Sequence, residues 1–186
     1  MKGEAFVGVD LEDLTANDKL VLLVLGASSK TTTTRLHKLS LIVNAVVEGN
    51  QPSSHGAYHY GGFSDEVDSA MIQLEEDGLI KRTGDKKLVL TEYGQKVMGS
   101  LDKTKDKQAA DVQGVVRLVV DSLKAVPDQD LVDLTYILFP ELTTKSVIRS
   151  KVEQRILGKK IRGVDVHQFR REDLKKFLES LTEQKE

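Results

Sequence analysis

Apolar residues recur at helical spacing in two segments near the start of the chain. A first helix is expected over residues 19–25, an almost continuous apolar run that follows a capping pair, Thr15 and Asp18, and ends at Gly26. A second helix is predicted over about residues 34–48, where apolar residues cover one broad side. Both helices are expected to contribute to a hydrophobic core.

A helix, a hairpin and another helix are predicted in the stretch that begins at Ser64. Ser64 is a favourable N-cap residue, and Gly78 can adopt the left-handed conformation that ends a helix. Two short strands, residues 79–82 and 88–90, are joined by a polar turn. The next helix extends to about Leu101. This order of elements is typical of a winged helix.

The segment before this stretch, residues 50–62, is predicted to be a loop because it contains Pro52, several serines and several glycines. Aromatic residues in and around the loop are expected to pack over the core rather than stack on nucleic-acid bases. These residues are Tyr58, Tyr60, Phe63 and Tyr93.

The C-terminal half is predicted to be helical. The expected helices span residues 108–125, 131–139, 145–157 and 173–181, with Thr144 as the cap of the third and a basic break at 158–163. The charge run 102–107 is the predicted junction. The fold class is therefore mainly α with a small β-hairpin: a winged helix-turn-helix domain of residues 15–101, followed by a helical C-terminal domain of residues 104–184.

Several sequence motifs resemble a known family. They read "RLHKLSLIV", "YHYGGFSDEV", "LEEDGLI", "LTEYGQKVM" and "YILFPELTTKSVIRSKV". Together they resemble the YwgA-like group of uncharacterised winged-helix proteins, and more distantly the Panacea-type antitoxin domains, which share a "KLQKLL…YGPxS" pattern. The resemblance covers roughly residues 34–152, and the chain has Gly62 where the first group usually has proline. It implies a winged-helix fold more than it implies an activity.

Composition limits the class of protein. The chain has 186 residues, of which 30% are charged and 39% hydrophobic, as is typical of a globular protein. It has no cysteine, which excludes disulfides and thiolate zinc sites. No apolar run is long enough to span a membrane and the N-terminus does not resemble a signal peptide, so a cytoplasmic protein without membrane contact is expected.

Charge is unevenly distributed along the chain, although the formal net charge is only −2. Residues 1–100 contain 10 lysines and arginines against 14 carboxylates, whereas residues 141–176 contain 11 against 5. Attraction to DNA is therefore expected from the hairpin and the C-terminal third, with an ordinary solvated surface as the alternative. The candidate nucleic-acid-binding residues are Lys81, Arg82, Lys86, Lys87, Lys145, Arg149, Lys151, Arg155, Lys159, Lys160 and Arg162.

The helix over residues 65–77 contains no lysine or arginine, so it is not expected to read DNA as the second helix of a helix-turn-helix normally does. Its carboxylates are instead candidate contacts for a basic protein partner. They are Asp65, Glu66, Asp68, Glu75 and Glu76. The valine-rich side of the helix that begins near Gln108 indicates a possible homodimer.

Candidate chemistry is sparse. His55 and His59 are four residues apart, but the nearby sequence offers no third ligand, so no metal site and no cofactor are predicted. No catalytic motif frames a nucleophile or a pair of carboxylates, so no catalytic residue is assigned. The sequence predicts a non-enzymatic, transcription-regulator-like protein that associates with nucleic acid. The alternative is a protein-interaction or antitoxin-like module whose acidic helix docks a basic partner.

Overall fold

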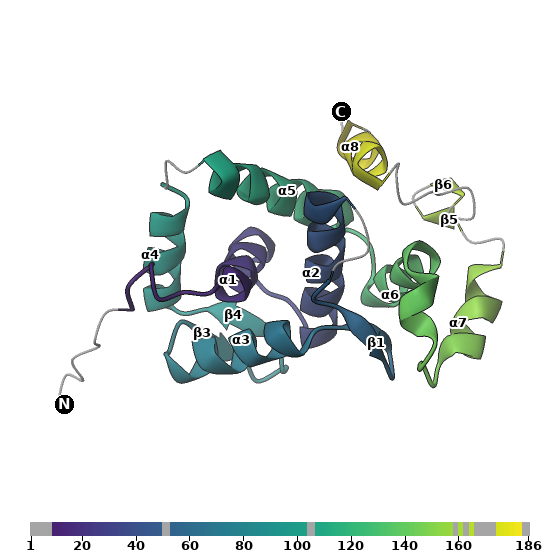
Figure 1. Ribbon diagram of the computed structural model, residues 1–186, viewed down its shortest axis with the longest axis horizontal. Helices are drawn as coiled ribbons and strands as arrows, with labels where there is room; N and C mark the ends of the chain where they lie inside the picture. The colour runs from purple at the N-terminus through teal and green to yellow at the C-terminus, as the bar shows by residue number, and fades with distance from the viewer. Residues whose placement is uncertain are drawn as a thin grey trace.

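The structure is a computed structural model that describes residues 9–49, 53–103, 107–157, 160–161, 164–165 and 174–183. These residues form a mainly helical protein with small antiparallel hairpins (Figure 1). The elements are α1 (Ala16–Ser28), α2 (Thr33–Glu48), β1 (Gly56–Tyr58), β2 (Gly61–Phe63), α3 (Asp65–Glu76), β3 (Ile80–Arg82), β4 (Leu88–Leu90), α4 (Glu92–Leu101), α5 (Lys107–Leu123), α6 (Asp128–Leu138), the 3₁₀ helix η1 (Pro140–Thr143), α7 (Arg149–Ile156), β5 (Lys160–Ile161), β6 (Val164–Asp165) and α8 (Leu174–Glu183).

Helix α1 lies at the centre of the N-terminal half and is surrounded by α2, α3, α4 and α5 (Figure 1). The predicted capping pair is present at its start. The amide of Asp18 donates to the Thr15 hydroxyl at 3.1 Å, and the amide of Thr15 donates to the Asp18 carboxylate at 2.8 Å. This capping box satisfies two amides that have no partner within the helix.

The ends of α3 also follow the sequence prediction. The Ser64 hydroxyl accepts a hydrogen bond from the amide of Val67 at 3.1 Å, which caps the first turn. Gly78 has a φ of 70°, the left-handed conformation expected after the helix. The apolar side of α3 faces the core through Val67, Ala70, Met71 and Leu74.

Strands β3 and β4 pair in an antiparallel register in which Ile80 faces Leu90 and Arg82 faces Leu88. Thr31 extends this hairpin, because its amide and carbonyl both bond to Leu88, at 3.1 and 2.7 Å. Directly after β4, Gly94 lies against the backbone of Leu79: an added Cβ would stand 1.9 Å from the Leu79 carbonyl oxygen. The predicted hairpin and the helix α4 that follows it are confirmed.

The prediction of a loop over residues 50–62 was wrong in its described part. Residues 56–58 and 61–63 form the hairpin β1–β2, in which Tyr58 pairs with Gly61. Gly61 has a φ of 85°, which lets the chain reverse after two intervening residues. The hairpin is held from outside, because the buried amine of Lys38 donates to two of its carbonyls.

Helices α5 and α6 match their predictions, and α6 ends before Pro140. The predicted helix from residue 145 was wrong at its start, because α7 begins only at Arg149. Tertiary contacts hold the preceding segment in another conformation. The amide of Val147 donates to the carbonyl of His59 at 3.1 Å, and the Ser146 hydroxyl donates to the same carbonyl at 3.2 Å.

The predicted break at 158–163 is partly a hairpin, because residues 160–161 pair with residues 164–165. Lys159 and Arg162 lie outside the described residues, as do residues 104–106 of the predicted junction. On both sides of that junction, side chains from Leu14 to Leu178 belong to a single hydrophobic cluster. The proposed division into two domains therefore stays a prediction.

The C-terminal part of the valine-rich side of α5 is buried within the chain. Val116, Val119 and Val120 are at most 3% exposed, in the cluster that α5 shares with α1, α2 and α8. Val112 and Val115 on the same side are only partly buried, so the homodimer stays a prediction. Every helix in the described ranges is too short or too polar to cross a membrane.

Candidate functional site

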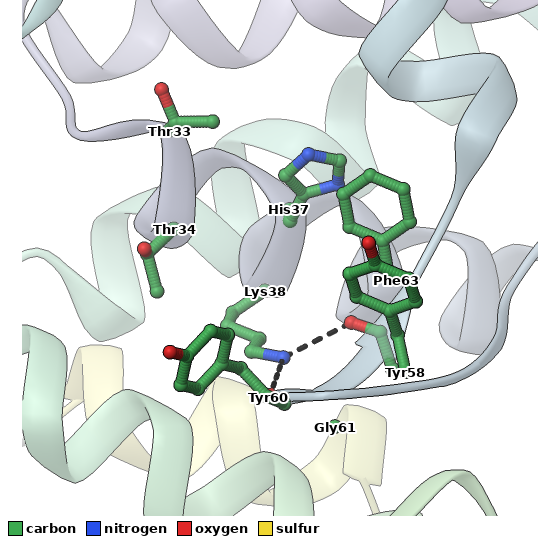
Figure 2. A pocket seen from close by; sticks show the side chains of 9 residues that line it. Thr33, Thr34, His37, Lys38, Tyr58, Tyr60, Gly61 and Phe63 are labelled. Carbon is green, nitrogen blue, oxygen red and sulfur yellow. Dashed lines mark hydrogen bonds between the residues drawn. The ribbon is translucent and has the colours of Figure 1, made fainter. Parts of the chain in front are cut away.

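A pocket of about 150 Å³ opens between the N-terminal half of α2 and the hairpin β1–β2 (Figure 2). Its wall consists mainly of carbon atoms, with a few polar groups from α2. The residues that line it are Thr33, Thr34, His37, Lys38, Tyr58, Tyr60, Gly61, Gly62 and Phe63.

Lys38 is the polar centre of this pocket. Its side chain extends from α2 to the hairpin, where the amine donates to the carbonyl of Tyr60 at 2.9 Å and to that of Gly62 at 3.0 Å (Figure 2). Only 3% of Lys38 is exposed, and this burial lowers the pKa of its amine to about 8. The sequence signal for this residue is a lysine on the apolar side of a predicted helix, and that signal alone does not indicate a site.

His37 lies beside Lys38 and is 4% exposed. Its ring stacks on Phe63 with the centroids 4.4 Å apart, and its Nε2 atom is 3.6 Å from a carboxylate oxygen of Asp68. Neither ring nitrogen has a hydrogen-bond partner among the described residues. Burial lowers the pKa of His37, and the neighbouring charge of Asp68 opposes that effect. His37 therefore has one ring nitrogen near the Asp68 carboxylate and one, Nδ1, without a partner in the described ranges.

A second hollow borders the first, with Tyr58 and Phe63 common to both. Here His55 is 4% exposed, and burial, together with the positive charges of His37 and Lys38, lowers its pKa to about 4. His59, in contrast, is exposed at the surface. Within the described part of the chain, no three histidine or carboxylate side chains gather where they could hold a metal ion.

The aromatic residues of the hairpin differ from their prediction. Tyr93 packs against the core as expected, and its hydroxyl accepts a hydrogen bond from the amide of Val9. Tyr58 and Tyr60 instead are 48% and 60% exposed. Tyr58 uses one side to stack on Phe63, with centroids 4.8 Å apart. Two aromatic side chains are therefore exposed at the rim of the pocket.

The predicted cations of the β3–β4 hairpin fall into two groups. Arg82 forms an ion pair with Glu75 at 3.1 Å, and Lys87 lies 3.6 Å from Asp85. The other two are exposed and have no ion pair within the described residues: Lys81 and Lys86. Half of the predicted basic hairpin is thus already neutralised by the chain itself.

The C-terminal cations are similarly divided. Arg155 lies 2.7 Å from a carboxylate oxygen of Asp133, which is fully buried, and Arg149 lies 2.7 Å from Glu153. The Arg155 pair connects α7 to α6, and the Arg149 pair lies within α7. The remaining described cations of the predicted set are exposed, without an ion pair in the described ranges: Lys145, Lys151 and Lys160.

The outward face of α3 combines carboxylates with an exposed aliphatic side chain. Asp65, Ser69, Ile72 and Glu76 follow one another at helical spacing, and each is exposed. Ile72 is 51% exposed. Of the other predicted partner residues, Glu66 is also exposed, whereas Asp68 faces His37 and Glu75 pairs with Arg82.

No protein-family model, curated protein or solved structure matches this chain.

Proposed function

We propose that the N-terminal half is a winged helix in which α3 takes the position of the recognition helix and β3–β4 forms the wing. The order of the elements supports this proposal, as does the pairing of Thr31 with Leu88, which adds a third short segment to the wing. The motif resemblance to the YwgA-like group, and more distantly to Panacea-type domains, belongs to the same proposal.

We infer that this module is non-enzymatic and binds a basic protein partner through the outward face of α3. The observation that carries the inference is the exposure of Ile72 between Asp65 and Glu76. An aliphatic side chain can enter a pocket on a partner and supply binding energy. The carboxylates around it favour lysine and arginine on that partner and accelerate association.

The charges of this face also disfavour DNA as its ligand. Placing α3 in a groove would bring carboxylates towards phosphates, where most of the binding energy normally comes from cations. The nearest arginine, Arg82, is engaged with Glu75 and with the Thr33 hydroxyl. A protein surface of opposite charge is therefore the better complement to α3.

Charge reversal and truncation on α3 test this function. Proteins captured from the native lysate by the wild-type chain are compared with those captured by Ile72→Ser and by Glu76→Lys. We expect a protein with a basic surface to be captured by wild type and lost in both variants. Glu92→Lys, an equivalent charge reversal on the exposed surface of α4, should retain it.

With the captured partner purified, Ile72→Ser should weaken binding by roughly 10-fold, the loss expected for a central apolar contact. Glu76→Lys should weaken association most at low salt, because its effect is electrostatic. Unchanged affinity in both variants would show that α3 is not the docking surface.

Nucleic-acid binding is a second candidate, supported by the exposed amines of Lys81 and Lys86 on the wing, which form no ion pair with any described residue. Binding to a fluorescent duplex would be measured by anisotropy over a range of salt concentrations. Lys81→Ala with Lys86→Ala should reduce the slope of log affinity against log salt by about 2, roughly one per phosphate contact. Lys96→Ala, an exposed cation on α4, is the control. A slope equal to that of wild type would exclude the wing.

A further inference from the structure

Lys38 is a buried cation without a counter-ion in the described part of the chain. Its two hydrogen-bond partners are the neutral carbonyls of Tyr60 and Gly62, and none of the described carboxylates is within ion-pair distance. An ammonium group has three N–H donors, so one remains after these two bonds. Buried charges are normally paired, because desolvation makes an unpaired one unfavourable. An anion in the adjoining pocket would supply the missing charge.

The walls of the pocket favour a flat, apolar group beside that anion. Tyr60 lies on one side of Lys38, and Tyr58 with Phe63 lies on the other (Figure 2). Rings stack favourably on such side chains. The volume of about 150 Å³ equals that of a cavity that accommodates benzene. The pocket therefore has room for one aromatic ring.

The first turns of α2 supply further polar groups at the same place. The exposed hydroxyl of Thr34 has no hydrogen-bond partner among the described residues and lies in the lining of the pocket. The buried His37 ring, whose Nδ1 atom has no partner among the described residues and whose Nε2 atom faces Asp68, lines the pocket one turn further along α2. The positive end of the helix dipole adds to the attraction for an anion. These groups are independent of the charge on Lys38 and indicate the same ligand chemistry.

We propose that the pocket between α2 and the β1–β2 hairpin binds a small aromatic carboxylate. The carboxylate lies against the free N–H of Lys38 and the hydroxyl of Thr34, and the ring lies between Tyr58 and Tyr60. The ring excludes water from the ion pair, which strengthens it. This site is distinct from the proposed docking face, because it uses α2 and the hairpin rather than the outward side of α3.

Benzoate is the probe, with binding followed by calorimetry and by chemical-shift changes of the full chain. Benzamide has the same ring without the charge, and inorganic phosphate has charge without the ring. We expect benzoate to bind at least about 10-fold more tightly than either compound. Equal binding of benzamide or of phosphate would overturn the assignment to aromatic carboxylates. The absence of saturable benzoate binding at about 10 mM would overturn the site itself.

Variants of the lining locate the binding. Lys38→Met should reduce benzoate affinity by about 10-fold or more, the effect of removing a charged hydrogen bond. Because Lys38 also anchors the hairpin, Tyr60→Ala and Thr34→Val provide tests on exposed side chains. Each should weaken binding by about 3- to 10-fold without changing the melting temperature. Lys96→Met is the control, and unchanged affinity in both Tyr60→Ala and Thr34→Val would overturn the proposal.

The pH dependence of binding gives a readout that a purely structural lysine would not change. Burial lowers the pKa of Lys38 to about 8, so the amine loses its charge as the pH rises through that value. Benzoate affinity should fall by about 10-fold between pH 7 and pH 9. The decrease should disappear in Lys38→Met. Equal pH dependence in the two proteins would show that another group attracts the carboxylate.

Discussion

Arg35 connects α2 to the end of α5, and its replacement by methionine is expected to destabilise the whole protein. Its guanidinium donates to the carbonyl of Leu123 at 2.6 Å, to that of Val126 at 2.7 Å and to the carboxylate of Asp128 at 2.9 Å. The hydroxyl of Thr32 donates to the same carboxylate at 2.7 Å. The Arg35 side chain is only 13% exposed. Methionine keeps much of its length and removes every donor.

The size of the effect follows from the groups left without a partner. A hydrogen bond from a charged donor contributes about 1.5–3 kcal/mol, and such contributions add incompletely when they share one side chain. Three lost bonds, partly replaced by water, should therefore lower the free energy of unfolding by about 3–5 kcal/mol. For a chain of this length, the melting temperature should decrease by roughly 6–20 °C.

Thermal unfolding followed by circular dichroism at 222 nm measures the change. Arg117→Met is the control, because Arg117 pairs with Asp102 at 3.0 Å but is 63% exposed. An exposed pair contributes at most about 1 kcal/mol, so the control should melt within about 4 °C of wild type. A decrease in melting temperature for Arg35→Met no larger than that of the control would show that the Arg35 hydrogen bonds do not stabilise the fold. Two separate transitions in Arg35→Met would support the predicted division into two domains.

Three further predictions concern other parts of the structure. Gly94→Ala should lower the free energy of unfolding by about 3 kcal/mol, because the added Cβ clashes with the backbone of Leu79. Gly99→Ala, in the same helix with no neighbouring atom within 4 Å, should leave the stability unchanged or raise it, and equal melting temperatures of the two variants would contradict this. Arg155→Met should lower the free energy of unfolding by about 1–3 kcal/mol, because it removes the cation beside the buried Asp133 carboxylate, which otherwise accepts a hydrogen bond from Gln129 at 3.3 Å. Adding Asp133→Asn should restore part of the loss, and no recovery would argue against the charge of Asp133 as its cause. Burial lowers the folded-state pKa of His55 to about 4, so between about pH 6.5 and pH 4 the unfolded chain binds a proton that the folded chain does not. The free energy of unfolding should therefore fall by about 3 kcal/mol in total as the pH decreases over that range. Urea titrations of His55→Gln should show a smaller decrease over that range, and an identical profile would exclude His55 as its source.

Some features of the candidate site could be predicted from the sequence, and others could not. The carboxylates of α3 and the cations of the β3–β4 hairpin could be named from the sequence, because both lie in short, clearly bounded elements. The sequence does not show which of these side chains are free to contact a partner. Arg82 pairs with Glu75 of α3, whereas Ile72 is exposed on a helix whose other apolar residues are buried. Exposure depends on which neighbours cover a side chain, and periodicity alone does not specify those neighbours.

Local sequence is sufficient to predict the elements whose ends are held by bonds between near neighbours. Thr15 and Ser64 cap their helices through partners three residues away, and Gly78 ends α3 through its own conformation. The β1–β2 hairpin and the pocket beside it, in contrast, depend on tertiary contacts. Lys38 reaches hairpin carbonyls 22 and 24 residues further along the chain, and the segment before α7 is held by a carbonyl of His59. Such bonds depend on how the helices pack, because packing brings these distant groups within reach of one another.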